Sequence, residues 1–182
     1  MSVFNSLIDQ AEVIKALQDA VLASRNNADK TQGMTHAWLF TGPPGSGRSN
    51  AAIAFAAALV CKEGGCSKCK ECMSTITGSH SDVELIRTQG LSIKIDEVKE
   101  LISRASWAPS VANWRVVVIE DADRLTDSAA NALLKVIEEP GLRTVWLLCA
   151  PTLTDVLPTI RSRCRHLSLR TPSTKAITNL LI

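Results

Sequence analysis

The sequence predicts an α/β domain with a central parallel sheet that is covered by helices on both faces. Short runs that are apolar at every position alternate along the chain with longer segments of helical periodicity, and strands buried on both faces are typical of parallel sheets. A glycine-rich turn, GPPGSGRSN at residues 42–50, also lies between one such run and an apolar helix. That setting is the usual one for a phosphate-binding loop.

The elements are expected in the following order. An amphipathic helix covers residues 11–23, because Val13, Leu17 and Val21 fall on one helical face. A polar loop follows at 24–35. Strands are expected at 36–42, 82–87, 114–121, 144–150 and 165–169, and helices from 49 onward and at 94–109, 128–140 and 157–164. Residues 1–170 are expected to form this domain, and residues 171–182 to begin a second one that is truncated here.

Composition narrows the class of protein. A chain of 182 residues with a formal net charge of +2 is long enough for one domain but too weakly charged to indicate nucleic-acid binding by itself. The chain does not open with a secretory signal, and its most apolar window, residues 51–61, is shorter than the ~20 residues that cross a bilayer. We therefore expect a cytosolic protein whose six cysteines are thiols or metal ligands.

The glycine-rich turn follows the phosphate-loop pattern G-x-x-x-x-G-K-[ST] at all but one position. The residues concerned are Gly42, Gly45, Gly47, Arg48 and Ser49. Arg48 stands where the pattern has lysine, and its planar guanidinium cannot replace a compact ammonium group isosterically. The sequence indicates the ancestry of a phosphate loop. It leaves open whether the loop still binds nucleotide or is kept only as a strand-to-helix turn.

Two acids, Glu120 and Asp121, end the strand at 114–121. In phosphate-loop proteins such acids hold Mg²⁺ and polarise the attacking water. The usual order is Asp and then Glu, so the order here is reversed and each carboxylate is displaced by about one C–C bond. The alternative is a pair of solvated acids at a strand end.

Four cysteines form the clearest metal signal: Cys61, Cys66, Cys69 and Cys72. Their spacing within residues 61–72 suits a closed tetrahedral Zn²⁺ site, which would stabilise a segment too small to hold a core. An iron–sulfur cluster also uses four cysteines, and Cys61 could instead be a core residue at the end of the apolar helix. We expect structural zinc.

Four segments together carry a family resemblance: HAWLFTGPPGSGRS, the cysteine insert, VVVIEDADRLTDSAANALLKVIEEP and TIRSRC. They are similar to the bacterial clamp-loader subunits of DNA polymerase III. The resemblance implies a RecA-like AAA+ domain with a zinc module after the phosphate-loop helix and a helical lid that begins near residue 171. Within the family, the chain resembles the delta-prime branch more than the gamma/tau motor branch at three positions. These are Arg48, the inverted acid pair, and Ala150 with Pro151 at the sensor position.

The resemblance implies a subunit that helps to load the sliding clamp onto primed DNA but does not bind ATP and Mg²⁺ or hydrolyse ATP itself. Arg163, in a motif with Ser162 and Cys164, would act as an arginine finger on the ATP of a neighbouring subunit. The implied partners are the gamma/tau motor subunits, the delta subunit, and through the assembly the clamp and DNA, with no membrane.

Two alternatives stay open. One is a gamma/tau-type motor subunit that hydrolyses ATP. The other is a zinc-dependent nucleic-acid binder, although the cysteine cluster lacks the basic and aromatic interleaving typical of that class.

Overall fold

Five parallel strands form one sheet in the computed structural model, which describes residues 2–26 and 34–181. The strands are β1 (Ala37–Thr41), β2 (Val83–Ile86), β3 (Arg115–Ile119), β4 (Thr144–Ala150) and β5 (Arg165–Ser168). Their order across the sheet is β2-β3-β4-β1-β5, and every neighbouring pair is parallel. The central position of β1 and β4 explains why both are buried at every residue.

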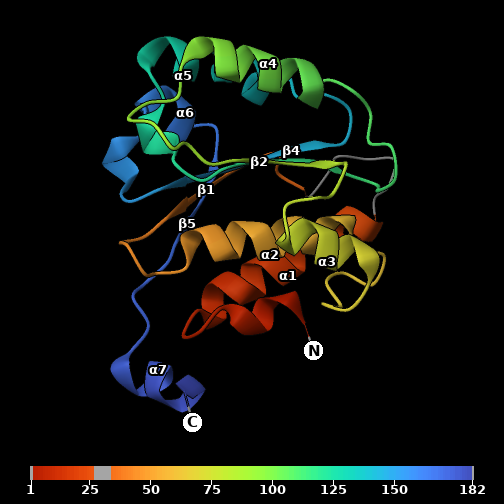
Figure 1. Cartoon of the computed structure of the whole chain (residues 1–182), viewed down its shortest axis with the longest axis vertical. Coiled ribbons are helices and arrows are strands. Elements are labelled where there is room, and N and C mark those ends of the chain that lie inside the picture. Colours follow the sequence, from red (N-terminus) through yellow and green to blue (C-terminus); the bar gives the residue numbers. More distant parts are fainter. Residues whose placement is uncertain (1, 27–33, 182) are drawn as a thin grey trace.

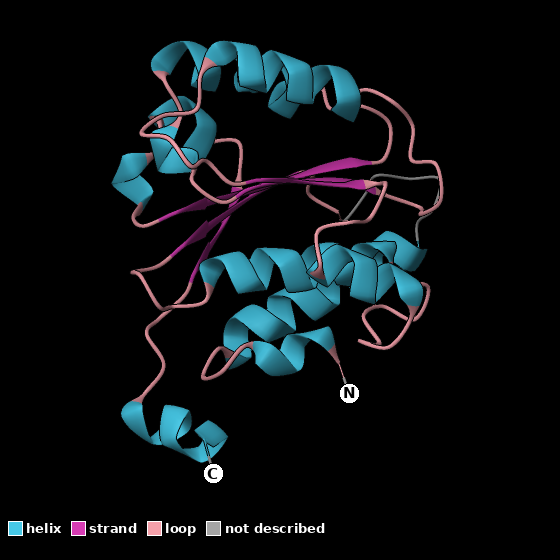
Figure 2. Cartoon of the chain, in the orientation of Figure 1, coloured by secondary structure: helices cyan, strands magenta, loops and turns pink. Residues whose placement is uncertain are grey.

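Helices cover both faces of the sheet, which appears as a single layer between two helical layers (Figures 1 and 2). One layer holds α1 (Ala11–Asn26), α2 (Arg48–Val60) and α3 (Lys70–Ile76), and the other holds α4 (Ile95–Ala105), α5 (Asp127–Glu138) and α6 (Pro158–Arg161). Short 3-10 turns lie at Val3–Ser6, Ala122–Arg124 and Leu153–Asp155. The last helix, α7 (Thr174–Leu181), lies apart from both layers (Figure 1).

The two faces of the sheet contribute side chains to two separate hydrophobic cores. Because side chains alternate along a strand, Trp38 and Phe40 of β1 pack towards the α1–α3 layer, whereas Leu39 packs towards the α4–α6 layer. Trp38 meets Phe55 of α2 edge-on, with ring centroids 5.0 Å apart. Helix α2 lies between the sheet and the N-terminal elements, so it must be apolar on all sides.

The structure confirms the predicted α/β class and parallel sheet, with shifts at element ends. Helix α1 continues to Asn26, α2 starts at Arg48 rather than 49, and the helix expected at 157–164 is the single turn α6. Helix α3 was not predicted. The expected loop at 24–35 lies partly in residues 27–33, outside the described residues. The proposed division near residue 170 stays a prediction.

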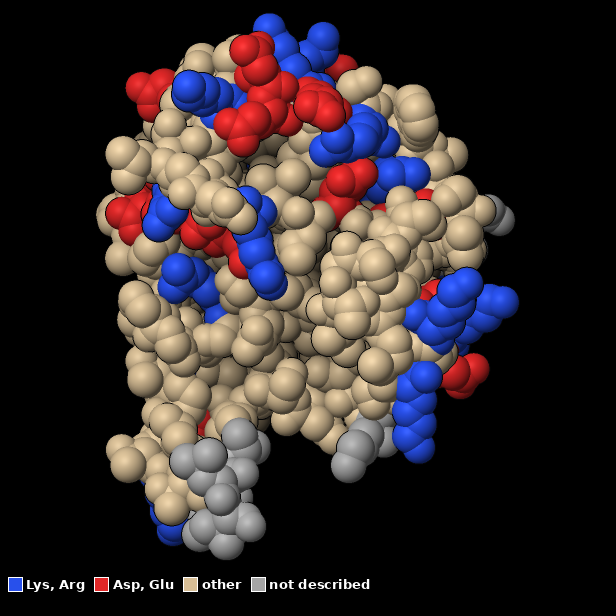
Figure 3. All heavy atoms as spheres, viewed as in Figure 1, with Lys and Arg blue, Asp and Glu red and all other residues tan. Residues whose placement is uncertain are grey.

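Charged side chains of both signs are interspersed over α4 and α5 in the view of Figure 3. Ion pairs such as Arg104 with Glu100 and Glu84 tie some of them together. Over the residues that the structure describes, no helix has both the length and the apolar character needed to cross a bilayer.

Candidate functional site

The glycine loop and the acid pair lie at the same edge of the sheet. The loop follows β1, and Glu120 and Asp121 follow β3, with β4 between these two strands. Because the carboxyl ends of parallel strands meet at one edge, the fold brings together residues about 70 positions apart in the sequence. Ligands of open α/β sheets bind at this edge.

The backbone of the loop has the form of a phosphate-binding nest. Gly45 and Gly47 both adopt φ of 83°, a region that favours glycine. At Gly42 a side chain has no room, since a Cβ would lie 2.9 Å from the Leu169 carbonyl oxygen. Several N–H groups make no hydrogen bond to the described residues: those of Gly45, Gly47, Arg48 and Ser49. The main chain therefore keeps donors at the start of α2, where an anion is favoured.

The side chain at the lysine position does not extend from this nest. Arg48 Nη1 donates to the Gly42 carbonyl oxygen at 2.7 Å, and its Nε atom is buried without a partner among the described residues. The guanidinium therefore closes the loop on itself. In a working loop the corresponding ammonium group would meet the β- and γ-phosphates of the nucleotide.

The first residue of the acid pair has an ion-pair partner outside the loop. Glu120 Oε2 pairs with Arg87 Nε at 2.8 Å, and its side chain is 12 % exposed. Asp121 stands at the start of the turn Ala122–Arg124. The adjacent Cys149 on β4 is fully buried, and burial, together with the negative charges of Glu120 and Asp121, raises the pKa of its thiol. One carboxylate oxygen of Glu120 is thus held by Arg87, while the other, Oε1, is buried without a partner among the described residues.

At the end of β4 the sensor position is apolar. Ala150 is fully buried, and the Pro151 carbonyl accepts a hydrogen bond from the Gly42 N–H at 3.2 Å. Neither side chain can donate to a phosphate. These residues therefore support the base of the loop without adding a polar group to it.

The four predicted metal ligands come together. The Sγ atoms of Cys61, Cys66, Cys69 and Cys72 all lie within 4.8 Å of one another. Cys61 Sγ is 3.7 Å from Cys66 Sγ and 3.6 Å from Cys69 Sγ. Tetrahedral zinc with Zn–S bonds of about 2.3 Å would place neighbouring sulfurs about 3.8 Å apart. The donor set and its spacing therefore fit a closed zinc site.

The surroundings of these cysteines shift the pKa values of their thiols in different directions. The N–H groups of Lys68 and Cys69 lower the pKa of Cys66 to about 6, whereas burial raises the pKa of Cys69 and of Cys72. A bound cation would favour the deprotonated form of the more buried thiols. The cluster packs against the N-terminal turn, where the Val3 N–H donates to the Gly65 carbonyl at 3.0 Å.

The predicted finger residue follows α6. Arg163 Nη2 lies 2.6 Å from Glu138 Oε1, and its Nη1 donates to the Thr159 carbonyl at 2.8 Å and to Ser162 Oγ at 3.3 Å. Cys164 packs on the core of the α4–α6 layer, and burial raises the pKa of its thiol to about 12. The motif is therefore anchored by Cys164, while the guanidinium stays 40 % exposed.

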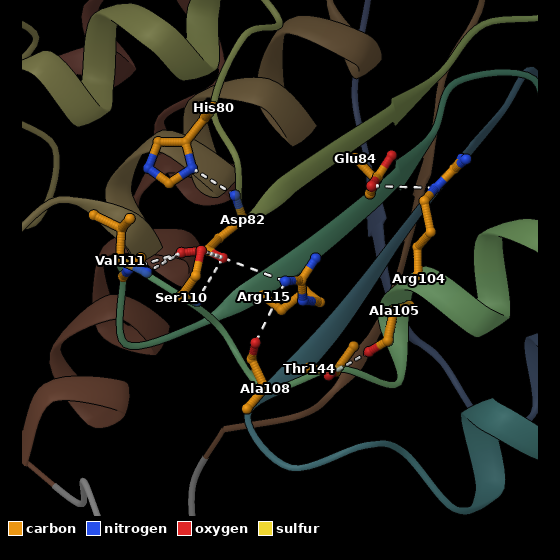
Figure 4. A network of polar contacts seen from close by, with 11 residues as sticks. His80, Asp82, Glu84, Arg104, Ala105, Ala108, Ser110, Val111, Arg115 and Thr144 are labelled. Carbon is orange, nitrogen blue, oxygen red and sulfur yellow. Dashed lines mark hydrogen bonds and ion pairs between the residues drawn. The ribbon is translucent and has the colours of Figure 1, made fainter.

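One structural anchor was missed by sequence reasoning. Asp82, which precedes β2, is fully buried and accepts hydrogen bonds from the Ser110, Val111 and Ala112 N–H groups at 2.7–2.8 Å (Figure 4). These bonds outweigh its desolvation and lower its pKa to about 2. Arg115 Nη2 lies 3.4 Å from the same carboxylate. Asp82 therefore fixes the loop between α4 and β3.

A second missed anchor connects the chain ends. The Gln10 amide donates to the Arg170 carbonyl at 2.6 Å and accepts from the Arg170 N–H at 3.3 Å. Asp9 Oδ2 accepts from the Ser173 N–H at 2.9 Å and from its hydroxyl at 2.7 Å. Together these residues hold the segment that leads from β5 to α7.

Comparisons with known proteins place the chain in a family. Residues 17–173 match the family model described as "DNA polymerase III, delta subunit". The chain is 35% identical over 169 residues to DNA polymerase III subunit delta' of Bacillus subtilis, covering 91% of this chain and 51% of that protein. It is 32% identical over 172 residues to subunit gamma/tau of Mycobacterium bovis, covering 92% of this chain and 28% of that protein. The chain thus spans about half or less of the length of these relatives.

Solved structures show the same fold. RuvB of Thermotoga maritima superposes with a TM-score of 0.66 at 19% identity, covering 98% of this chain and 51% of that one. A DNA polymerase III gamma subunit-related protein from the same organism gives a TM-score of 0.61 at 23% identity, covering 85% of this chain and 47% of that one. With the five-stranded parallel sheet, these likenesses confirm the predicted RecA-like AAA+ fold.

Proposed function

The chain belongs to the family of DNA polymerase III clamp-loader subunits, and on that premise we propose that it is a delta-prime-type subunit. In this role it helps to load the sliding clamp onto primed DNA and does not hydrolyse ATP itself. The observation that carries the proposal is the contact from Arg48 Nη1 to the Gly42 carbonyl. This contact takes the cation of the loop away from the place of the β- and γ-phosphates.

Two further features support a retired nucleotide site. Glu120, at the metal position of the acid pair, is paired with Arg87, and Asp121, at the base position, has the shorter side chain. Ala150 and Pro151 provide no side-chain donor at the sensor position. Three departures at separate positions of one site are more easily explained by lost chemistry than by one tolerated substitution.

The proposed contribution of this subunit to catalysis is Arg163. In a ring of AAA+ subunits this guanidinium would reach the γ-phosphate held by a gamma/tau neighbour and stabilise the charge of the transition state. Its exposure of 40 % and its place directly after a short, core-anchored helix suit a group that must meet another subunit. The proposed assembly contains the gamma/tau and delta subunits and works in the cytosol on primed DNA.

We also propose that the four-cysteine cluster holds a structural Zn²⁺. The cation would keep the thiolates together and tie the segment 61–72 to the end of α2 and to the N-terminal turn. The module then supports the rear of α2, the helix whose first turn carries the glycine loop. No chemistry of ATP hydrolysis is assigned to it.

The test uses the assembled clamp loader with this chain in its full-length subunit. Arg48→Ala is expected to leave DNA-stimulated ATP hydrolysis and clamp loading unchanged, whereas the same change at the loop lysine of the motor subunits should abolish both. Thermal melting of the variant subunit would confirm that it stays folded. Loss of clamp loading in a folded Arg48→Ala assembly would contradict the proposal.

A motor subunit of the gamma/tau type is the second candidate. The identity of 32% to gamma/tau proteins and the open N–H groups of the loop favour it. It requires that Arg48 leave Gly42 and meet a phosphate. In that case Arg48→Ala would remove a measurable share of the ATP hydrolysis of the assembly.

A further inference from the structure

We propose that Glu138 is a positioning residue for Arg163. In the free subunit its carboxylate binds the Arg163 guanidinium, and in the assembly it competes for this guanidinium with the γ-phosphate of the ATP held by the neighbouring subunit. This inference rests on the proposed role of Arg163 as an arginine finger. The two residues come from different elements, because Glu138 is the last residue of α5 and Arg163 follows α6.

The two terminal nitrogens of the Arg163 guanidinium have different partners. Nη1 donates to the Thr159 carbonyl and to Ser162 Oγ, both on the same short helical segment as Arg163 itself. Nη2 is the atom that meets Glu138, at 2.6 Å. The contacts with Thr159 and Ser162 therefore orient the Arg163 side chain. The contact with Glu138 limits how far Nη2 can bind another group.

The backbone on both sides of the pair is held in place. Ile160 of α6 is fully buried, and Ile137, the neighbour of Glu138 on α5, is buried in the same core. Both charged ends remain partly exposed, at 40 % for Arg163 and 49 % for Glu138. The two ends are therefore accessible to another subunit without movement of either helix.

A phosphate group bound by Arg163 would compete with Glu138 for the guanidinium. Arginine binds phosphate most strongly through two parallel N–H donors, and with Nη1 already engaged these must come from Nη2 and Nε. Glu138 already accepts from Nη2, which leaves at most one of the two N–H groups of that atom free, and its carboxylate would add a negative charge beside the incoming phosphate. Binding of the neighbour's ATP must displace this carboxylate, so Glu138 is expected to weaken that binding.

The experiment measures steady-state ATP hydrolysis by the reconstituted clamp loader with clamp and primed DNA. Glu138→Gln removes the charge but keeps the size of the side chain. It is expected to lower the KM for ATP by about two- to fivefold, the range for a partly exposed ion pair, with a smaller change in kcat. The effect should shrink as salt is raised, because salt screens the pair.

Two controls make the result specific. Glu139→Gln removes the next charge along, on an exposed residue that forms no ion pair with the described residues, and is expected to leave KM at the natural value. In an Arg163→Ala background, Glu138→Gln should have no effect, because its partner is gone.

The outcomes separate this inference from the proposed function. If Arg163→Ala leaves hydrolysis unchanged, the finger assignment fails and the role of Glu138 fails with it. If Arg163→Ala slows hydrolysis but Glu138→Gln matches Glu139→Gln, only the positioning role is overturned. An effect of Glu138→Gln that persists without Arg163 would also overturn it.

Discussion

The guanidinium of Arg48 is hydrogen-bonded to the carbonyl of Gly42, six residues earlier, at 2.7 Å. Gly42 is the first residue of the phosphate-loop pattern and Arg48 stands at its lysine position, so this contact joins the two ends of the loop. Gly45 and Gly47 adopt φ of 83°, which glycine reaches without a steric cost. The backbone of the loop can therefore keep its form whichever side chain stands at position 48. The loop thus keeps the backbone form of a phosphate loop, while its one cationic side chain contacts the main chain.

The buried carboxylate of Asp82 should be a principal source of stability. Asp82→Asn is expected to reduce the free energy of unfolding by about 3–5 kcal/mol at pH 7, because it leaves Arg115 buried without its charge partner. Urea unfolding measures this difference. The same change at the exposed Asp19 in the middle of α1 is the matched control and should alter stability by less than about 0.5 kcal/mol.

The contribution of Asp82 should also depend on pH. Its pKa is lowered to about 2 in the folded chain, below the value of about 3.9 in an unfolded chain. The stabilisation is therefore present above about pH 4 and is lost as the pH falls towards 2, a change of about 2 kcal/mol. The gap between the natural chain and Asp82→Asn should narrow over that range. A gap that stays constant would contradict the assignment.

Metal content tests the cysteine cluster. The natural chain should bind about one Zn²⁺ per molecule by elemental analysis, and removal with a chelator should lower its melting temperature. Cys69→Ser should lose the metal, whereas Cys149→Ser, which changes a buried thiol outside the cluster, should retain it. Full metal content in Cys69→Ser would show that the cluster is not the site.

Arg163→Ala in the assembled clamp loader should slow ATP hydrolysis by the neighbouring subunit by up to about 10³-fold. The reason is that the transition-state charge on the γ-phosphate loses its partner. Arg161→Ala, two residues away at the end of α6, is the control and should change the rate little. Equal rates for the two variants would remove Arg163 from the mechanism.

Gln10→Ala should loosen the segment before α7. The variant leaves both main-chain groups of Arg170 without their amide partner, at a cost of about 1–3 kcal/mol. Limited proteolysis should then cut near residues 170–173 faster than in the natural chain. Gln18→Ala, an exposed position of α1, should not alter cleavage; faster cleavage in this control as well would argue against a specific link.

The sheet was predictable because its strands are short apolar runs between turns. The runs that contain Trp38 and Trp146 have no polar face, and in runs this short between turns that property is typical of buried parallel strands. The four cysteines were likewise predictable, since ligands close in sequence need little tertiary information to meet. Helix α3 was missed because it is short and begins within the cluster, where the Cys69 side chain accepts from the Cys72 N–H.

The remaining anchors depend on distant partners. In the sequence Asp82 is an ordinary acid at the start of an expected strand, and its role is evident only when Ser110, 28 residues away, lies over it in the fold. Gln10 meets Arg170 across 160 positions, which no local pattern encodes. For Arg48 the sequence predicted a misfit with the lysine position, but the direction of its side chain required the folded loop.

Calorimetric titration of Mg²⁺–ATP into the natural chain, with Arg48→Lys in parallel, tests the central claim most directly. The account predicts no binding heat from the natural chain, because Arg48 remains on the Gly42 carbonyl. Binding that appears only in Arg48→Lys would identify the guanidinium as the group that closes the loop. Clear micromolar binding by the natural chain would contradict the account and favour a nucleotide-using subunit.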